Sequence, residues 1–471
     1  MKGYRAVVGV LLVLGVISGV FVYNHFFRTR TPVFASDEDH FLFGSIGTED
    51  TDGIPYWLWL VLPRIFPEYL PSPGGYASLG VLSKEGNEMP VGFSKATIGY
   101  ERVGTNCAVC HTASVRLRPD DPPMIVPAAP AHELAMPQYL RFLSACASDP
   151  RFTADTVLDE VAKNYRLPIS DRLIFRFILI PSAKRNILRL TARYSWTHDR
   201  TEAGRGRVDL PNSAKFGLLR QPIGTTVGNA DMPPVWNLSA HSGRSYLWDG
   251  SNTNLQEVVV SSAISAGSGT KWIDRDVTSL NRVQQYLSSV RPPAYPLPID
   301  RPLAALGANL FERDCGSCHS PGGTRTGTVV PIAEVGTDPY RLAAWTPASA
   351  AAFNAYGSGH AWQFSHFRAT TGYVAVSLDG LWLRAPYLHN GSVPTLEDLL
   401  NPPASRPSFF WRGYNVYDTH HVGFMTTGNE ARREGTAFDT RQPGNSNAGH
   451  SYGTSLSPDD KRALIEYLKT L

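Results

Sequence analysis

The sequence predicts a mainly α-helical chain in which two similar units follow an N-terminal apolar helix. Three observations predict this fold class. An apolar run opens the chain, a Cys-x-x-Cys-His motif occurs twice, and one short segment recurs downstream of each motif. With 471 residues, of which 42% are hydrophobic, the chain is long enough for roughly two or three domains with a large core.

The N-terminal apolar run extends from Ala6 to Tyr23 and follows two basic residues. Its length lies between that of a long signal sequence and that of a short membrane-spanning helix, and either would export the rest of the chain. The step Val33-Phe34-Ala35 resembles a cleavage site, but two arginines lie between it and the apolar run. We therefore expect residues 1–35 to remain as an uncleaved signal anchor.

Helical periodicity follows at 133–147, 153–165 and 172–190, and Pro181 interrupts the last of these segments. Residues 54–70 are apolar but are broken by Pro63 and Pro67, so they are too short and too interrupted to span a bilayer. We expect this stretch to pack inside the protein, with contact to a membrane surface as the alternative.

A proline-rich stretch at 291–302, RPPAYPLPIDRP, interrupts the helical pattern and is typical of a semi-rigid linker. We place the domain boundary there, which leaves an N-terminal unit at 36–290 and a C-terminal unit at 303–471.

Two helices are predicted to frame the C-terminal unit. Apolar residues recur with helical spacing from Leu303 through Leu306 to Phe311, directly before the second cysteine motif. At the other end, Ser457 is suited to cap a helix that begins at Pro458, and an apolar stripe continues to Leu471. Two crossing helices can shield a flat cofactor held by that motif.

The two Cys-x-x-Cys-His motifs predict covalent haem attachment, because the two thiols bind the haem vinyl groups and the histidine binds the iron. We therefore predict two haem c groups and a mainly α fold with two cytochrome c-like haem domains, which carry long loop-rich insertions behind an N-terminal membrane helix. The attachment residues are Cys107, Cys110, Cys315 and Cys318, and the proximal iron ligands are His111 and His319.

Zinc binding is a poor alternative for these motifs, because each offers three ligands and no matching second pair completes a closed site. The fifth cysteine, Cys146, lies in an apolar helical pattern. We expect it to be a small buried side chain without chemistry of its own.

An internal repeat links the two units. Tyr246–Glu257, YLWDGSNTNLQE, aligns with Tyr387–Asp398, YLHNGSVPTLED, and each copy lies downstream of its own haem motif. Trp248 in the first copy occupies the place of His389 in the second. Two related units explain this repeat better than two unrelated domains.

The face of each iron opposite the proximal histidine decides its function, because a sixth protein ligand favours electron transfer and an open position admits dioxygen or peroxide. For the first haem, His132 and Met136 follow the motif, and neither stands out as a ligand. For the second haem the candidate ligands are His389, His420, His421, Met425 and His450.

These features resemble the dihaem cytochrome c peroxidase superfamily over the whole chain after the anchor. The resemblance rests on the two haem motifs, on MPPVWN, LWDGSNTNLQE and APYLHNGSVPTLEDLL, and on the ending GNSNAGHSYGTSLSPDDKRALIEYLKTL. The ending and GTNCAVCHTASVR are most similar to the bacterial rubber-oxygenase branch.

The resemblance implies an open N-terminal haem as the reaction centre and a bis-histidine C-terminal haem. It makes His450 the first choice for the sixth ligand of the second iron, and His389 the second choice. It also implies that Trp248 lies between the haems and relays electrons. Relatives hold a calcium ion between domains, but the scattered Asp and Asn residues assign no calcium ligands here.

The sequence departs from the peroxidase pattern in two ways. Residues 261–269 read SSAISAGSG, where an acidic residue is expected, and no histidine stands at the matching distal position after the first motif. Without an acid or base beside the iron, cleavage of a peroxide bond loses its proton shuttle. Both departures weaken a peroxidase assignment.

The sequence therefore favours an oxidoreductase with a single pass through the bacterial inner membrane and haem domains in the periplasm. Its N-terminal haem would react with peroxide or dioxygen, and its partners would be a redox protein or a small oxidant. A pure electron-transfer cytochrome without substrate turnover, or a subunit of a larger complex, is the alternative. The net charge of +3, without a long basic run, argues against a nucleic-acid partner.

Overall fold

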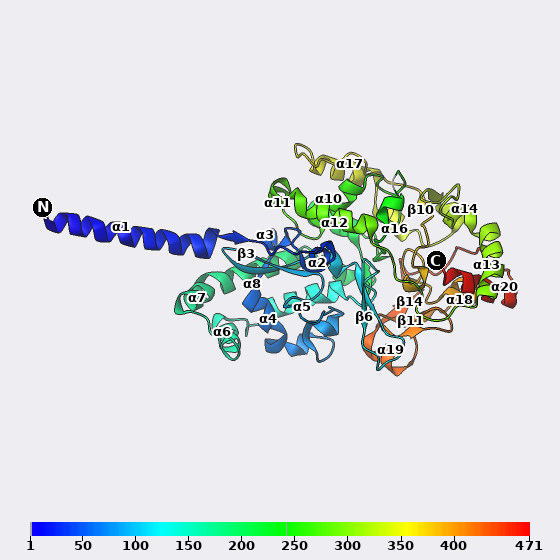
Figure 1. The fold of residues 1–471 in the computed structure, drawn as a ribbon, viewed down its shortest axis with the longest axis horizontal. Helices are drawn as coiled ribbons and strands as arrows, with labels where there is room; N and C mark the ends of the chain where they lie inside the picture. The colour runs from blue at the N-terminus through cyan, green and yellow to red at the C-terminus, as the bar shows by residue number, and fades with distance from the viewer. Residues whose placement is uncertain (1, 242) are drawn as a thin grey trace.

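The computed structural model describes residues 2–241 and 243–471. The fold is helix-rich with several small antiparallel sheets, which confirms the mainly α prediction. One long helix projects from a body whose two ends are formed by the earlier and later parts of the chain (Figure 1).

The α-helices are α1 (Lys2–Val22), α2 (Asp37–Phe43), α3 (Thr48–Thr51), α4 (Tyr56–Ile65), α5 (Met136–Ser148), α6 (Ala154–Ala162), α7 (Ile169–Ile174), α8 (Ile180–Ala192), α9 (Leu210–Asn212), α10 (Leu255–Ser265), α11 (Thr270–Arg275), α12 (Val277–Ser289), α13 (Arg301–Asp314), α14 (Gly316–His319), α15 (Ile332–Val335), α16 (Tyr340–Ala344), α17 (Pro347–Tyr356), α18 (Leu396–Leu399), α19 (Gly428–Glu434) and α20 (Pro458–Leu468).

The strands are β1 (Thr29–Arg30), β2 (Ile54–Pro55), β3 (Phe93–Ile98), β4 (Tyr100–Thr105), β5 (Thr112–Val115), β6 (Met124–Pro127), β7 (Arg207–Val208), β8 (Ala230–Asp231), β9 (Val329–Pro331), β10 (Gly372–Val374), β11 (Phe409–Arg412), β12 (Tyr417–Asp418), β13 (Gly423–Phe424) and β14 (Thr436–Asp439). The first four form one antiparallel sheet in the order β1-β3-β4-β2, and the others pair two by two.

The apolar N-terminal run forms α1 and a following π-helical turn, and Val7–Phe27 is long and apolar enough to cross a membrane. None of the most apolar stretch of this span is buried in the body. A signal sequence has the same length and composition, so these two properties of the helix fit either a membrane span or a signal sequence.

The helices predicted at 133–147 and 153–165 are present as α5 and α6. The segment at 172–190 forms α7 and α8, and its interruption is a π-helical turn at Phe175–Leu179. Pro181 follows directly on this π-helical turn, and the helical conformation continues through it into α8. Cys146 is fully buried, as predicted.

The apolar stretch at 54–70 packs inside the protein through α4, which confirms the first of the two alternatives for it. Leu58, Trp59 and Leu62 of this helix are all buried in the main core.

The two predicted framing helices of the C-terminal unit are α13 and α20. Helix α13 begins at Arg301, because Asp300 caps it through the N–H of Leu303 at 3.0 Å. A Cβ atom on Gly307 would lie 1.9 Å from the carbonyl oxygen of Ala463, so the two helices cross in backbone contact. Small residues form the crossing between α13 and α20. The predicted apolar stripe is therefore wrong at Leu306, which is 61% exposed.

Both copies of the repeat adopt the same closed turn. Tyr246 pairs with Asn252 and Tyr387 pairs with Val393, at an identical offset. The leucine after each tyrosine has a positive φ, 65° in the first copy and 70° in the second, and each turn closes at a glycine with positive φ. Because a leucine rarely adopts this conformation, the match supports a common origin of the two segments.

Candidate haem sites

The first cysteine motif lies at the end of β4, where Asn106 fixes the start of the following turn. The Asn106 side chain accepts a hydrogen bond from the Ala108 N–H at 3.0 Å and donates one to the Gly44 carbonyl at 2.9 Å. The chain then turns at Cys107–Val109 and presents its thiols to a cavity.

His111 is oriented by the Pro233 carbonyl, which accepts a hydrogen bond from its Nδ1–H at 2.8 Å. This contact leaves the Nε2 lone pair free, as in a histidine that binds a metal. Burial lowers the pKa of His111 to about 4, so the ring is neutral and able to act as a ligand.

A cavity of about 590 Å³ contains both thiols of the first motif and the His111 ring. Trp248 and the serine-rich segment near Ser261 form part of its wall. The thiols, the free imidazole nitrogen and the size of the cavity together fit a covalently attached haem.

The cavity also receives side chains from distant parts of the chain. Its sulfur and imidazole groups include Met136, His198 and Met232, and its carboxylates are Asp52, Asp209, Asp231 and Asp249. These four carboxylates all come from outside residues 261–269, the segment in which the sequence lacks the acid of a peroxidase pocket. Burial raises the pKa of Asp52, although Arg193 opposes this shift.

His132 does not line this cavity. Its ring stacks on Phe424 with centroids 3.8 Å apart, and neither ring nitrogen has a hydrogen-bond partner among the described residues. Burial, reinforced by the nearby Arg412, lowers the pKa of His132 to about 3.

The second motif lies at the junction of α13 and α14, where Cys315 ends one helix and His319 ends the next. The Nδ1–H of His319 donates to the Val376 carbonyl at 2.7 Å. His319 thus repeats the geometry of His111, with its Nε2 left free for a metal.

His450 lies opposite His319. The two ring centroids are 6.2 Å apart, and the ring planes differ by 48°. An imidazole nitrogen binds a metal at about 2 Å, so two rings on either side of one metal have centroids roughly 6 Å apart. Burial lowers the pKa of His450 to about 4, and the charges of His319 and Arg406 act in the same direction. The pair therefore fits a bis-histidine haem.

The loop that carries His450 is held in a strained form by Arg406. Its guanidinium donates to the carbonyls of Asn447 at 2.6 Å, Gly449 at 2.8 Å and His450 at 3.2 Å. His450 has a φ of 47°, which L-residues rarely adopt, and its N–H donates to Val335 at 2.7 Å.

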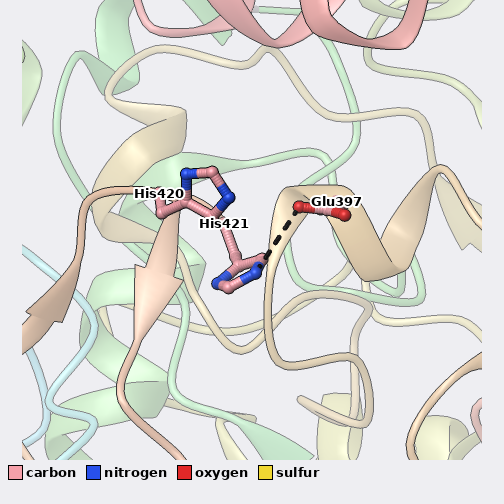
Figure 2. A group of neighbouring side chains, drawn as sticks. All are labelled: Glu397, His420 and His421. Atoms are coloured by element: carbon pink, nitrogen blue, oxygen red, sulfur yellow. Dashed lines mark ion pairs between the residues drawn. The ribbon is translucent and has the colours of Figure 1, made fainter. Parts of the chain in front are cut away.

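The other candidate ligands lie elsewhere. His389 is buried and stacks on Tyr373, with centroids 3.8 Å apart, and its Nε2 has no partner among the described residues. His420 and His421 lie together at the surface beside Glu397 (Figure 2). Met425 follows β13 and is exposed.

Trp248 is connected to the first site through the backbone of Asp231. Its indole Nε1–H donates to the Asp231 carbonyl at 2.7 Å, two residues before Pro233, which accepts from His111. The N–H of Asp231 donates to the carbonyl of His389 at 2.8 Å, so the backbone of this one residue joins the two copies of the repeat.

The same tryptophan is connected to the second site. The Val374 N–H donates to the Trp248 carbonyl at 2.9 Å, and Val376, two residues later, accepts the hydrogen bond from His319. Hydrogen bonds and short stretches of backbone therefore link the two proximal histidines through Trp248.

Comparison with known proteins relates this region to cytochromes. Residues 372–412 match the family described as RoxA-like, cytochrome c-like. The matched stretch contains the Val376 partner of His319, the second copy of the repeat as far as Asp398, and Arg406. The chain thus contains a RoxA-like cytochrome c-like domain, which implies haem c binding.

Two proteins of Sinorhizobium fredii (strain NBRC 101917 / NGR234) are similar to the chain. The uncharacterized protein y4iM is 33% identical over 288 residues, which is 51% of this chain and 64% of that protein. The uncharacterized protein y4iJ is 47% identical over 113 residues, which is 22% of this chain and 18% of that protein. The chain therefore spans less than two thirds of either relative.

The sequence did not point to Asp52, His198 or Arg341, which line the first cavity. None of them lies near a cysteine motif, and none belongs to a pattern in the sequence that predicts a binding site. Arg406 carries no signal in the sequence either, because its burial and its backbone partners are visible only in the fold.

Proposed function

We propose that this chain is an exported, membrane-anchored dihaem c-type cytochrome that acts as an oxidoreductase. The haem on Cys107 and Cys110 would react with peroxide or dioxygen, and the haem on Cys315 and Cys318 would store and deliver electrons. Haem iron supplies the one-electron and oxygen chemistry when it is bound. A redox protein would supply or accept the electrons.

One observation carries this proposal, namely the asymmetry between the two proximal histidines. His319 has a second imidazole, that of His450, at the spacing of a shared metal. No second imidazole lies at such a spacing from the His111 ring among the described aromatic contacts. A site with a sixth protein ligand favours electron transfer, whereas a site without one favours binding of a small oxidant.

The remaining residues support the division of roles. The carbonyls of Pro233 and Val376 hold the two proximal histidines, and Trp248 lies on the hydrogen-bonded connection between them. The cavity carboxylates provide groups that can hold or move a proton, and Asp52, whose pKa is raised by burial, is the first candidate.

The test is a pair of turnover assays on the purified, haem-loaded protein. Peroxide-dependent oxidation of a reduced cytochrome would support peroxidase chemistry, and dioxygen uptake with an unsaturated hydrocarbon would support oxygenase chemistry. If neither reaction occurs and neither haem binds carbon monoxide, the protein is an electron carrier.

The electron-carrier alternative rests on a specific observation. Met136, His198 and Met232 line the first cavity, and thioether or imidazole groups can supply a sixth ligand to haem iron. Replacement of each by alanine, followed by a search for a new high-spin iron signal, distinguishes this arrangement from an open site.

The anchor proposal rests on the apolar helix α1 and on its junction with the body. The His25 ring lies 3.1 Å from the Asp171 carboxylate, so the end of the apolar segment contacts α7. The proposed arrangement is a single pass through the bacterial inner membrane with the haem domains in the periplasm. Retention of the mature chain in the membrane fraction after a carbonate wash tests it.

A further inference from the structure

Three metal-ligating side chains meet on the surface outside the two haem sites (Figure 2). The ligand atoms of Glu397, His420 and His421 all lie within 4.8 Å of one another. The Nε2 atom of His421 is 3.8 Å from a carboxylate oxygen of Glu397. Two imidazoles and one carboxylate form a donor set that suits zinc and copper ions.

Backbone hydrogen bonds hold these ligands in place. The N–H of Leu396 donates to the Val422 carbonyl at 3.0 Å, and the N–H of Glu397 donates to the His421 carbonyl at 3.3 Å. The α18 helix is thus joined to the turn between β12 and β13. A cation that binds here needs to order only the side chains.

Asp418 orients the turn and one of the imidazoles. One of its carboxylate oxygens accepts the N–H groups of His420 and His421 at 3.0 and 3.1 Å, and the other accepts the Nδ1–H of His421 at 2.7 Å. The lone pair on Nε2 is then left for a metal. Metal-binding histidines commonly donate their second ring N–H to such an acceptor, which fixes the orientation of the ring.

We propose that Glu397, His420 and His421 bind one divalent transition-metal cation, with Asp418 as the group that orients His421. The cluster lies outside the haem cavity, so this proposal does not depend on the haem chemistry. Water would complete the coordination, because the side chains of Glu397 and His421 are about half exposed.

Titration of the full haem-loaded chain with Zn²⁺ tests this proposal. Mg²⁺ is the control cation, because it prefers oxygen ligands to imidazole. We expect one Zn²⁺ per chain, and a loss of affinity of about 10- to 100-fold or more in Asp418→Asn, His421→Ala and Glu397→Gln. His360→Ala is the matched control, because His360 is another surface histidine paired with an acid, Asp274. Absence of Zn²⁺ binding, or equal binding in all variants, overturns the site. An unchanged haem spectrum verifies that each variant is folded.

A second and independent observation concerns the segment from 163 to 193. It carries one acidic residue, Asp171, and eight basic ones, namely Lys163, Arg166, Arg172, Arg176, Lys184, Arg185, Arg189 and Arg193. The whole chain has a net charge of only +3, so the basic charge is concentrated here.

The same segment exposes large apolar side chains. Ile169 is 80% exposed, Leu173 is 52% exposed and Phe177 is 70% exposed, and they recur at a spacing of four residues. Aliphatic and aromatic side chains among basic residues are typical of helices that lie in a membrane interface. Anionic lipid headgroups complement the charge.

The position of α7 agrees with this chemistry. Figure 1 shows α7 at the end of the body from which α1 projects. The contact of His25 with Asp171 ties the helix to the end of the apolar segment and uses the only acid in this stretch. A membrane crossed by α1 would therefore pass close to α7.

We infer that α7 and the following π-helical turn dock on the surface of an anionic phospholipid bilayer. This inference rests on the anchoring part of the proposed function. It gives the body a fixed orientation, in which the end with α7 faces the lipid and the end with α13 points away.

The full chain in phosphatidylglycerol nanodiscs tests this inference through a nitroxide label at Phe177→Cys. The matched control is Leu306→Cys, another exposed apolar position on a helix at the opposite end of the body. The native Cys146 is buried, so it does not react with the label. We expect the label at 177 to be protected from a water-soluble nickel chelate, and Arg185→Glu with Arg189→Glu to reduce this protection.

Equal access of the chelate to both labels in nanodisc-bound protein overturns the docking of α7 and leaves the anchor intact. A chain that does not enter the nanodiscs overturns the anchor and the docking together.

Discussion

His111 and His319 have the same local geometry but face different surroundings. Each donates its Nδ1–H to a backbone carbonyl, at 2.8 Å and 2.7 Å. His319 is opposed by His450, whereas no imidazole faces His111 at that spacing among the described ring contacts. The difference between the sites therefore lies in what faces the proximal histidine.

We predict that His450→Ala converts the second haem from a saturated site to one that binds carbon monoxide. Removal of the imidazole opposite His319 leaves one face of the site without a ligand. A carbon monoxide difference spectrum measures the change as one additional equivalent bound per chain.

His389→Ala is the control for this prediction. The His389 ring is paired with Tyr373 and not with His319 among the described aromatic contacts. Carbon monoxide binding by the second haem in His389→Ala, and none in His450→Ala, would reverse the assignment.

The sequence alone could not choose between these histidines. His389, His420, His421 and His450 all lie in loops, and the path of a loop depends on distant contacts. For His450 those contacts are the three carbonyls held by Arg406 and the hydrogen bond to Val335. The resemblance to a family gave His450 its priority, because spacing carried no such information.

The pair α13 and α20 is the element that frames the second site. Both helices were predicted from apolar spacing and, for α20, from the Ser457 cap, which accepts the Asp460 N–H at 3.2 Å. Their close crossing at Gly307 could not be predicted, since a glycine in a helix is otherwise a weak helix former.

We predict that Gly307→Ala destabilises the protein, although alanine is the better helix former by about 1 kcal/mol. The added Cβ would lie 1.9 Å from the Ala463 carbonyl oxygen, and overpacking of this kind costs about 1–3 kcal/mol. Thermal unfolding measures the effect as a lower Tm. Leu306→Ala, at the exposed neighbouring position, should change the Tm little, and a higher Tm for Gly307→Ala would contradict the backbone contact.

The loop at 447–450 is a second element that depends on one side chain. We predict that Arg406→Leu frees this loop and allows part of the second haem to bind carbon monoxide, because three carbonyls lose their donor. Arg441→Leu removes an exposed arginine nearby in the chain and should leave the spectrum unchanged. If the second haem of Arg406→Leu binds no carbon monoxide, the loop keeps its conformation without the arginine, and the prediction is contradicted.

At the scale of the whole molecule, the two repeat copies converge on the backbone of Asp231. Trp248 donates to its carbonyl, and the carbonyl of His389 accepts from its N–H. The repeat itself was visible in the sequence, whereas this junction arises from β8, which has no counterpart in the repeat. Burial raises the pKa of Asp231, and the ion pair with Arg412 opposes this shift.

We predict that Trp248→Phe slows electron transfer between the two haems and leaves the absorption spectrum of each unchanged. The phenyl ring lacks the N–H that contacts Asp231, and it is harder to oxidise than an indole. Rapid mixing with a reductant, monitored at both haems, measures the rate. Trp236→Phe alters a different tryptophan, which is buried and donates to the Asp379 carbonyl at 2.9 Å, and this change should not slow the transfer. Equal rates in both variants would remove Trp248 from the route.

The most direct test of the central claim is the coordination of each iron in the purified, full-length protein, measured by electron paramagnetic resonance together with a carbon monoxide titration. The asymmetry between His111 and His319 predicts two haems per chain, one low-spin with two histidine ligands and one that binds carbon monoxide. Two six-coordinate, low-spin irons that bind no carbon monoxide would contradict it.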